Sequence, residues 1–194
     1  MVLQLAQQEE ADELLGRNPF ALVLGMLLDQ QVPIEWAFSS PLKVEQRLGG
    51  ELSVRAVAEH DPDGLIKVFA EPPATHRYPK AMAVRAQALA RFVMERYDGD
   101  MAALWTEAKS GKELFMRLKE LPGFGEAKAQ IFLALLGKQL GVQPRGWRTA
   151  AGGYGKQGSF RSVADIVDSE SLQRVRDHKA KMKAAAKSAK ASSA

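Results

Sequence analysis

A glycine-rich turn between two helical segments, Leu121–Gly125, constrains the fold of this chain more than any other feature. Ser110 and Glu113 predict the capped start of a helix that runs into the turn, and the apolar residues of 131–136 predict a second helix that leaves it. Glycine adopts the backbone angles of a tight turn and leaves no side chain in the way of a ligand. The second helix begins with unpaired N–H groups at its positive end, an arrangement that suits a phosphate.

The remaining segments also predict helices. Asn18–Pro19 and Asp61–Pro62 each combine a capping side chain with proline at the first helical position, and 79–97 has an amphipathic pattern. A glycine-rich loop is expected over 141–158 and one more helix over 162–176. No clear alternation of apolar and polar residues exceeds four residues, so strands are not expected. The sequence therefore predicts an all-α fold.

Composition excludes several classes of site. The chain has no cysteine, which rules out disulfides, a cysteine-ligated zinc ion and an iron–sulfur cluster, and its three histidines are scattered. Four acidic residues lie within 1–15, which argues against a signal peptide, and the longest apolar run, 20–28, is too short to span a membrane. We expect a cytoplasmic monomer with no membrane partner.

Positive charge is concentrated at the C-terminal end. Residues 171–194 have a net charge of +6 against +4 for the whole chain, which leaves −2 for residues 1–170. Residues 179–194 consist almost only of Lys, Ala and Ser, a composition that predicts a disordered basic tail. Such a tail favours an arm that tethers the protein to DNA; the alternative is an end without a role.

Three landmarks in order resemble the helix-hairpin-helix (HhH-GPD) base-excision DNA glycosylases, the superfamily of endonuclease III and of the adenine-mismatch, 8-oxoguanine and alkyl-base glycosylases. Asn18–Pro19–Phe20 with Asp29–Gln30–Gln31 is similar to the first core helix, 78–100 to the middle helix, and 121–129 to the hairpin. The resemblance covers residues 18–140. It implies two helical lobes: a six-helix bundle over 18–136, and a second lobe formed by 1–17 and 137–178.

In function, the resemblance implies a monofunctional DNA glycosylase that flips a damaged or inappropriate base into the cleft between the lobes and hydrolyses its N-glycosidic bond. Gln31 would fill the gap left in the duplex, with Gln30 beside it. No organic cofactor and no iron–sulfur cluster are expected; the backbone carbonyls of Lys119, Leu121 and Phe124 match positions that hold K⁺ or Na⁺. The expected DNA-binding residues are Gln30, Gln31, Leu121, Gly123, Phe124, Gly125 and Lys128.

The family's usual catalytic residues are missing. Arg145 stands where the resemblance places the catalytic aspartate, and Ala127 stands where bifunctional members carry their lysine, which argues against lyase activity. Asp29 is our first candidate for a substitute carboxylate, followed by Asp165 and Asp168. The alternative for each is an ordinary solvated charge on a helix.

Trp147 and Tyr154 are candidates to stack on an extruded base; alternatively, both anchor the loop to the body. The hairpin has a plain helix corner as its alternative, and Gln30–Gln31 an exposed helix end. A second function is therefore open: a catalytically inactive protein that recognises damaged, distorted or abasic DNA. A third is a DNA binder without preference for lesions.

Overall fold

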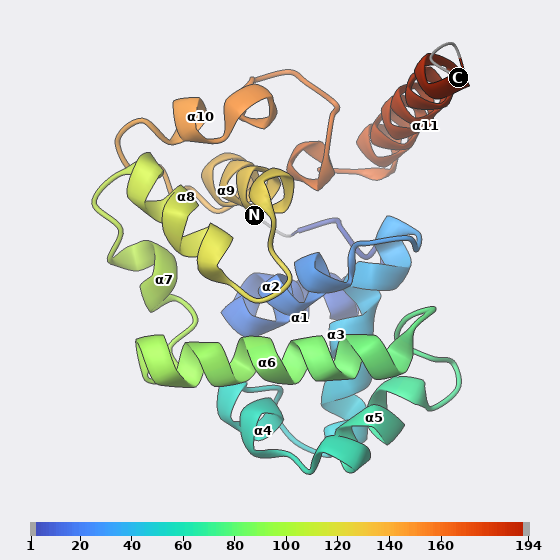
Figure 1. Cartoon of the computed structure of the whole chain (residues 1–194), viewed down its shortest axis with the longest axis vertical. Coiled ribbons are helices and arrows are strands. Elements are labelled where there is room, and N and C mark those ends of the chain that lie inside the picture. Colours follow the sequence, from blue (N-terminus) through green and yellow to red (C-terminus); the bar gives the residue numbers. More distant parts are fainter. Residues whose placement is uncertain (1–2, 192–194) are drawn as a thin grey trace.

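The computed structural model describes residues 3–191, and every regular element in that range is a helix, which confirms the all-α prediction (Figure 1). The elements, in chain order, are α1 (Glu9–Arg17), α2 (Pro19–Leu28), α3 (Ile34–Leu48), α4 (Val54–Glu59), α5 (Pro62–Ala70), α6 (Pro79–Tyr97), α7 (Ala103–Thr106), α8 (Gly111–Glu120), α9 (Glu126–Gln139), α10 (Trp147–Ala150), the 3₁₀ helices η1 (Gly152–Gly155) and η2 (Val163–Asp165), and α11 (Ser169–Ala191).

The helices pack in two neighbouring groups. In the first, α6 covers α4 and α5, and α3 packs against α1 and α2. In the second, α8 and α9 pack side by side, with α10, η1 and η2 against them. Figure 1 shows α2 between α6 and the α8–α9 pair. The lobe boundaries inferred from the resemblance stay a prediction.

The helix starts follow the sequence signals. The Asn18 side chain accepts hydrogen bonds from the N–H groups of Phe20 and Ala21, at 3.0 and 3.1 Å, and so caps α2. Every residue of α2 after Pro19 is buried, so this helix forms the centre of the core. The capped start therefore fixes the helix whose far end carries Asp29–Gln30–Gln31.

The C-terminal third differs from the sequence prediction. The single helix expected over 162–176 is divided into η2 and α11, because Ser162 and Asp168 each cap a separate start. The predicted loop over 141–158 contains α10 and η1. Residues 179–191 continue α11 where a disordered tail was predicted, since alanine and lysine both favour helix; residues 192–194 lie outside the described range. Across 3–191, no helix is both long and apolar enough for a membrane span.

Candidate nucleic-acid interface

The hairpin turn leaves an uncapped helix start. Gly123 has a φ of +85°, and a Cβ on it would lie 2.4 Å from Cδ1 of buried Leu27. The N–H of Phe124 donates to the carbonyl of Leu121 at 3.0 Å and closes the turn. At Gly125, the N-cap of α9, no described side chain caps the helix, and a Cβ would meet nothing within 4 Å. The first N–H groups of α9 are therefore open to a phosphate.

One carboxylate shares this helix start. Glu126 is exposed in the first turn of α9, where a negative charge offsets the positive end of the helix. A bound phosphate would lie near this carboxylate and be repelled by it. Glu126 therefore weakens the anion site that the turn creates.

Lys128 joins the hairpin to α2. Its Nζ donates to the carbonyls of Met26 and Leu27, at 2.7 and 2.9 Å, in the last turn of α2. Burial lowers the pKa of Lys128 to about 8, and the nearby Asp29 carboxylate opposes part of this effect. Lys128 thus points at the end of α2 rather than at solvent, and a direct contact to a DNA phosphate stays a prediction.

Asp29 lies at the end of α2, between two lysines. Its side chain is 11% exposed and pairs with Lys179 of α11 at 3.6 Å. Lys128 is close enough for its pKa to respond to the Asp29 charge. The structure therefore places this candidate carboxylate beside the hairpin helix and beneath α11.

Gln30 is held firmly in place. Its Nε2 donates to the carbonyl of Leu27 at 2.8 Å, and its Oε1 accepts from Arg85 at 3.1 Å. Its backbone carbonyl lies 2.9 Å from Nε2 of His76, whose Nδ1 accepts from the N–H of Tyr78. That pairing places the histidine proton on Nε2, and burial lowers the pKa of His76. The sequence showed no role for His76 here, because it lies 46 residues away.

Gln31 differs from its neighbour. It is exposed and has a φ of +59°, an uncommon backbone conformation for a residue with a side chain. Within the described chain, no hydrogen bond holds its side chain. Strained backbone of this kind is a reason to look for function. Here the side chain is free to enter a DNA duplex.

Tyr154 lines a cavity of about 480 Å³ between the α9 side of the second group and α11. Lys179, the partner of Asp29, lines the same cavity, so this lysine connects the cavity with the candidate carboxylate. Its volume lies in the range of ligand-binding pockets. The other lining residues are Ile131, Gly153, Arg161, His178 and Met182.

Trp147 does not share this position. It is 5% exposed, and its ring packs so closely on α9 that a Cβ at Gly137 would lie 2.4 Å from it. The ring is not available to stack on an extruded base, so we correct that part of the predicted base pocket. Trp147 anchors the loop, the alternative that its sequence context left open.

Asp165 and Asp168 both cap helices. The Asp165 carboxylate pairs with Lys138 at 2.5 Å and accepts from the backbone N–H groups of Arg161 and Ser162. The Asp168 carboxylate accepts from the N–H and hydroxyl of Ser171, and these hydrogen bonds lower its pKa. Both carboxylates are occupied by structural contacts, and Asp29 is the one beside the hairpin.

Arg145 lies at the other end of the α8–α9 pair. Its carbonyl accepts from the N–H of Gly111, the first residue of α8. A helix of 10 residues is about 15 Å long, so this contact is about that far from the hairpin turn. Arg145 is exposed and lies away from the hairpin turn. It is therefore not a neighbour of Asp29 that stands in for the missing catalytic aspartate.

The proposed cation site involves backbone alone. The side chains of Leu121 and Phe124 are buried, so both residues meet a ligand only through their backbone. The Leu121 carbonyl already accepts the hydrogen bond that closes the turn. No group of three or more His, Asp or Glu residues in the described range forms a metal site. K⁺ or Na⁺ at the carbonyls of Lys119, Leu121 and Phe124 stays a prediction.

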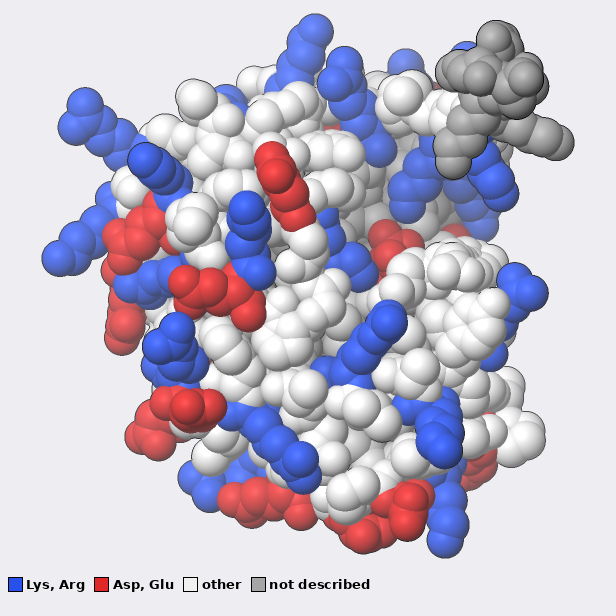
Figure 2. Space-filling view, viewed as in Figure 1, with Lys and Arg blue, Asp and Glu red and all other residues white. Residues whose placement is uncertain are grey.

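Basic side chains gather near α11. Figure 2 shows Lys and Arg atoms clustered at the upper right, where Figure 1 places this helix. Two ion pairs attach α11 to the first helix group: Arg176 with Glu35 of α3, and Lys179 with Asp29. These pairs tie the first part of α11 to the body next to the Tyr154 cavity, whereas Figure 1 shows the C-terminal part of this helix projecting away from the other helices.

A scan of protein-family models and searches of curated proteins and of solved structures each gave no match.

Proposed function

We propose that this chain is a DNA-binding protein of base-excision repair, a monofunctional DNA glycosylase that acts on a flipped base. One observation carries the proposal: Lys128, two residues into α9, bonds to the last turn of α2. The uncapped start of α9 and the segment Asp29–Gln31 are thereby parts of one rigid unit. A phosphate held at the hairpin would lie at a defined position relative to Asp29 and Gln31.

The proposed roles follow from exposure and contacts. The start of α9 holds a phosphate, and Gln31 fills the space that the flipped base leaves. The base enters the cavity lined by Tyr154, displacing Lys179 from Asp29. The Asp29 carboxylate then stabilises positive charge on the sugar as the N-glycosidic bond breaks, or activates water.

A second candidate is a protein that binds damaged, distorted or abasic DNA without cleaving it. The arrangement of carboxylates favours this candidate: Asp165 and Asp168 are occupied by caps, and Asp29 is paired with Lys179. Whether the protein is an enzyme or a binding protein therefore depends on whether Asp29 supports cleavage of the N-glycosidic bond.

Single-turnover excision on labelled duplexes distinguishes the candidates. The panel contains uracil, hypoxanthine, alkylated purines, 8-oxoguanine and an adenine mismatch, with hot alkali to reveal abasic sites. For a glycosylase, the strand that carries one of these lesions is cleaved, and only after alkali treatment. Asp29→Asn then slows the excision of that base by about 100-fold or more, while DNA binding is retained. Asp63→Asn, at an exposed site on α5, is the control and keeps the rate.

Lesion-selective binding without excision of any substrate would favour the second candidate. Binding without any lesion preference would refute both, and so would the absence of DNA binding.

A further inference from the structure

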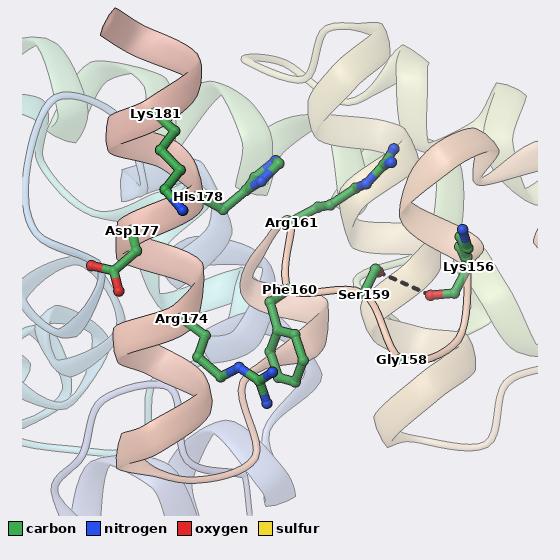
Figure 3. Close-up of a pocket in the computed structure, with 9 residues that line it drawn as sticks. All are labelled: Lys156, Gly158, Ser159, Phe160, Arg161, Arg174, Asp177, His178 and Lys181. Carbon is green, nitrogen blue, oxygen red and sulfur yellow. Dashed lines mark hydrogen bonds between the residues drawn. The ribbon is translucent and has the colours of Figure 1, made fainter.

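A second cavity, of about 530 Å³, lies between the loop 156–161 and α11 (Figure 3). Four cationic side chains and one carboxylate line it. The carboxylate, Asp177, points away from the loop that carries Phe160 in Figure 3 and accepts a hydrogen bond from Gln173. The cationic residues are Lys156, Arg161, Arg174 and Lys181, and His178 lies among them.

These cations have no carboxylate partner. Across residues 3–191, none of the four belongs to an ion pair, whereas Arg176 and Lys179 of the same helix do. The Arg174 guanidinium lies 3.8 Å from the centroid of the Phe160 ring, which orients its plane. A planar guanidinium with free N–H donors is suited to a phosphate.

The basic cavity and the Tyr154 cavity adjoin each other. Arg161 and His178 line both of them. The Tyr154 cavity offers apolar surface from Ile131 and Met182, whereas the second cavity offers charge. Together they provide an aromatic site for a base next to a cationic site for a phosphate.

Position along α9 agrees with one continuous strand. Ile131, in the wall of the Tyr154 cavity, lies five residues beyond the first residue of α9, about 7.5 Å along the helix axis. Successive phosphates of one DNA strand are spaced by about 3.4 Å of helix axis. A strand held at the hairpin can therefore reach both cavities within a few nucleotides.

We propose that the cavity between residues 156–161 and α11 binds a phosphate group of the nucleic-acid strand whose base occupies the Tyr154 cavity. This inference rests on the proposed function, and it adds a second phosphate site that does not involve the hairpin. The bound phosphate is either the terminal 5′-phosphate of the strand or an internal phosphate. A terminal phosphate carries more negative charge and is more exposed than an internal one.

The test uses the full chain and fluorescent 12-nucleotide single strands, with and without a 5′-phosphate, titrated over a range of salt concentrations. The double variant Arg174→Gln, Lys181→Gln removes two cations that line this cavity and do not line the Tyr154 cavity. Arg55→Gln, Arg96→Gln is the matched control, because both arginines are exposed and lie on α4 and α6. Thermal unfolding checks that all variants fold, and Arg174→Lys keeps the charge while losing the planar group.

We expect the cavity variant to bind 3- to 10-fold more weakly and to lower the slope of log K against log salt by about 0.7 to 1, with the control unchanged. For a terminal phosphate, the loss is confined to the 5′-phosphorylated strand; for an internal phosphate, both strands lose equally. An unchanged slope for both strands in the folded variant would overturn the proposal.

A hairpin variant, Gly125→Ala, separates this proposal from the proposed function. Weaker binding by the hairpin variant alone would refute the second phosphate site and leave the proposed function standing. Weaker binding by the cavity variant alone would support the second site and refute the hairpin as the anchor. Weaker binding by both supports both proposals, and unchanged binding by both refutes both.

Discussion

Two glycines of the hairpin should respond in opposite ways to the same substitution. Gly123→Ala places a side chain at a φ of +85° and a Cβ 2.4 Å from Cδ1 of Leu27. The left-handed conformation costs alanine about 1–2 kcal/mol. Leu27 is buried and has little room to move, so overpacking adds about 1–2 kcal/mol. We expect a free energy of unfolding lower by about 2–4 kcal/mol.

Gly125→Ala carries neither penalty. Its φ is −90° and a Cβ would meet nothing within 4 Å. Alanine is a poorer N-cap than glycine but reduces the entropy of the unfolded chain, and the two effects cancel to within about 1 kcal/mol. The methyl group would, however, lie on the N-cap residue, at the helix start where we expect the phosphate to bind. Binding to DNA should therefore weaken by roughly fivefold or more, about 1 kcal/mol.

The assay pairs thermal unfolding with fluorescence anisotropy on one labelled duplex. For a chain of this size, the expected melting temperature falls by about 5–15 °C for Gly123→Ala and by no more than about 4 °C for Gly125→Ala. If the two variants have the same melting temperature, Gly123 does not have the positive φ and the close approach to Leu27 that the prediction requires. If Gly125→Ala binds DNA as the unmodified protein does, the start of α9 is not a phosphate site.

Three further predictions concern charge and pH. Glu126→Gln removes the carboxylate beside the proposed phosphate and should raise DNA affinity about 2- to 5-fold in low salt; equal affinity would place the phosphate elsewhere. Burial lowers the pKa of Lys128 to about 8 in the folded protein, from 10.5 in the unfolded chain. Between pH 8 and pH 10.5 the unfolded chain therefore binds more protons at this residue than the folded protein does. The stability of the unmodified protein relative to Lys128→Met should thus rise over that range by up to about 3 kcal/mol, measured by urea unfolding; parallel curves would refute this. The pKa of His76 is also lowered, so its contribution is present above pH 6.5 and lost as pH falls further; His76→Phe should cost about 1–3 kcal/mol at pH 7.5 and less at pH 5.5, by the same method.

The local signals in the sequence predicted helix starts well. Asn18, Asp61 and Ser110 each cap the helix that the sequence places after them, because a capping bond spans only two or three residues. The turn at Gly123 follows from the same kind of short-range evidence. Local chemistry of this kind can be read without knowing the fold.

The contacts that build the site were not readable. The bond from Lys128 to the end of α2 joins residues 101 and 102 positions apart, and His76 reaches Gln30 over 46 positions. The spacing of residues on a helix predicts which face a side chain lies on. It does not predict which other segment of the chain that side chain contacts. The burial of Trp147 is similar, because its place depends on the small residue Gly137 of α9 packing beneath it.

The basic C-terminal segment now has two separable parts. Deleting residues 183–194 removes Lys183, Lys187 and Lys190 from the sequence but keeps Lys179 on Asp29 and the whole lining of both cavities. If the end of the chain is a non-specific tether, this deletion should lower affinity for all duplexes and flatten the salt dependence, with lesion preference intact. Deleting residues 179–194 also removes Lys179, the partner of Asp29, and takes Lys181 and Met182 from the cavity linings, so lesion preference should change as well. Anisotropy on lesion and undamaged duplexes measures both effects, and an identical response to the two deletions would show that Lys179 has no part in recognition.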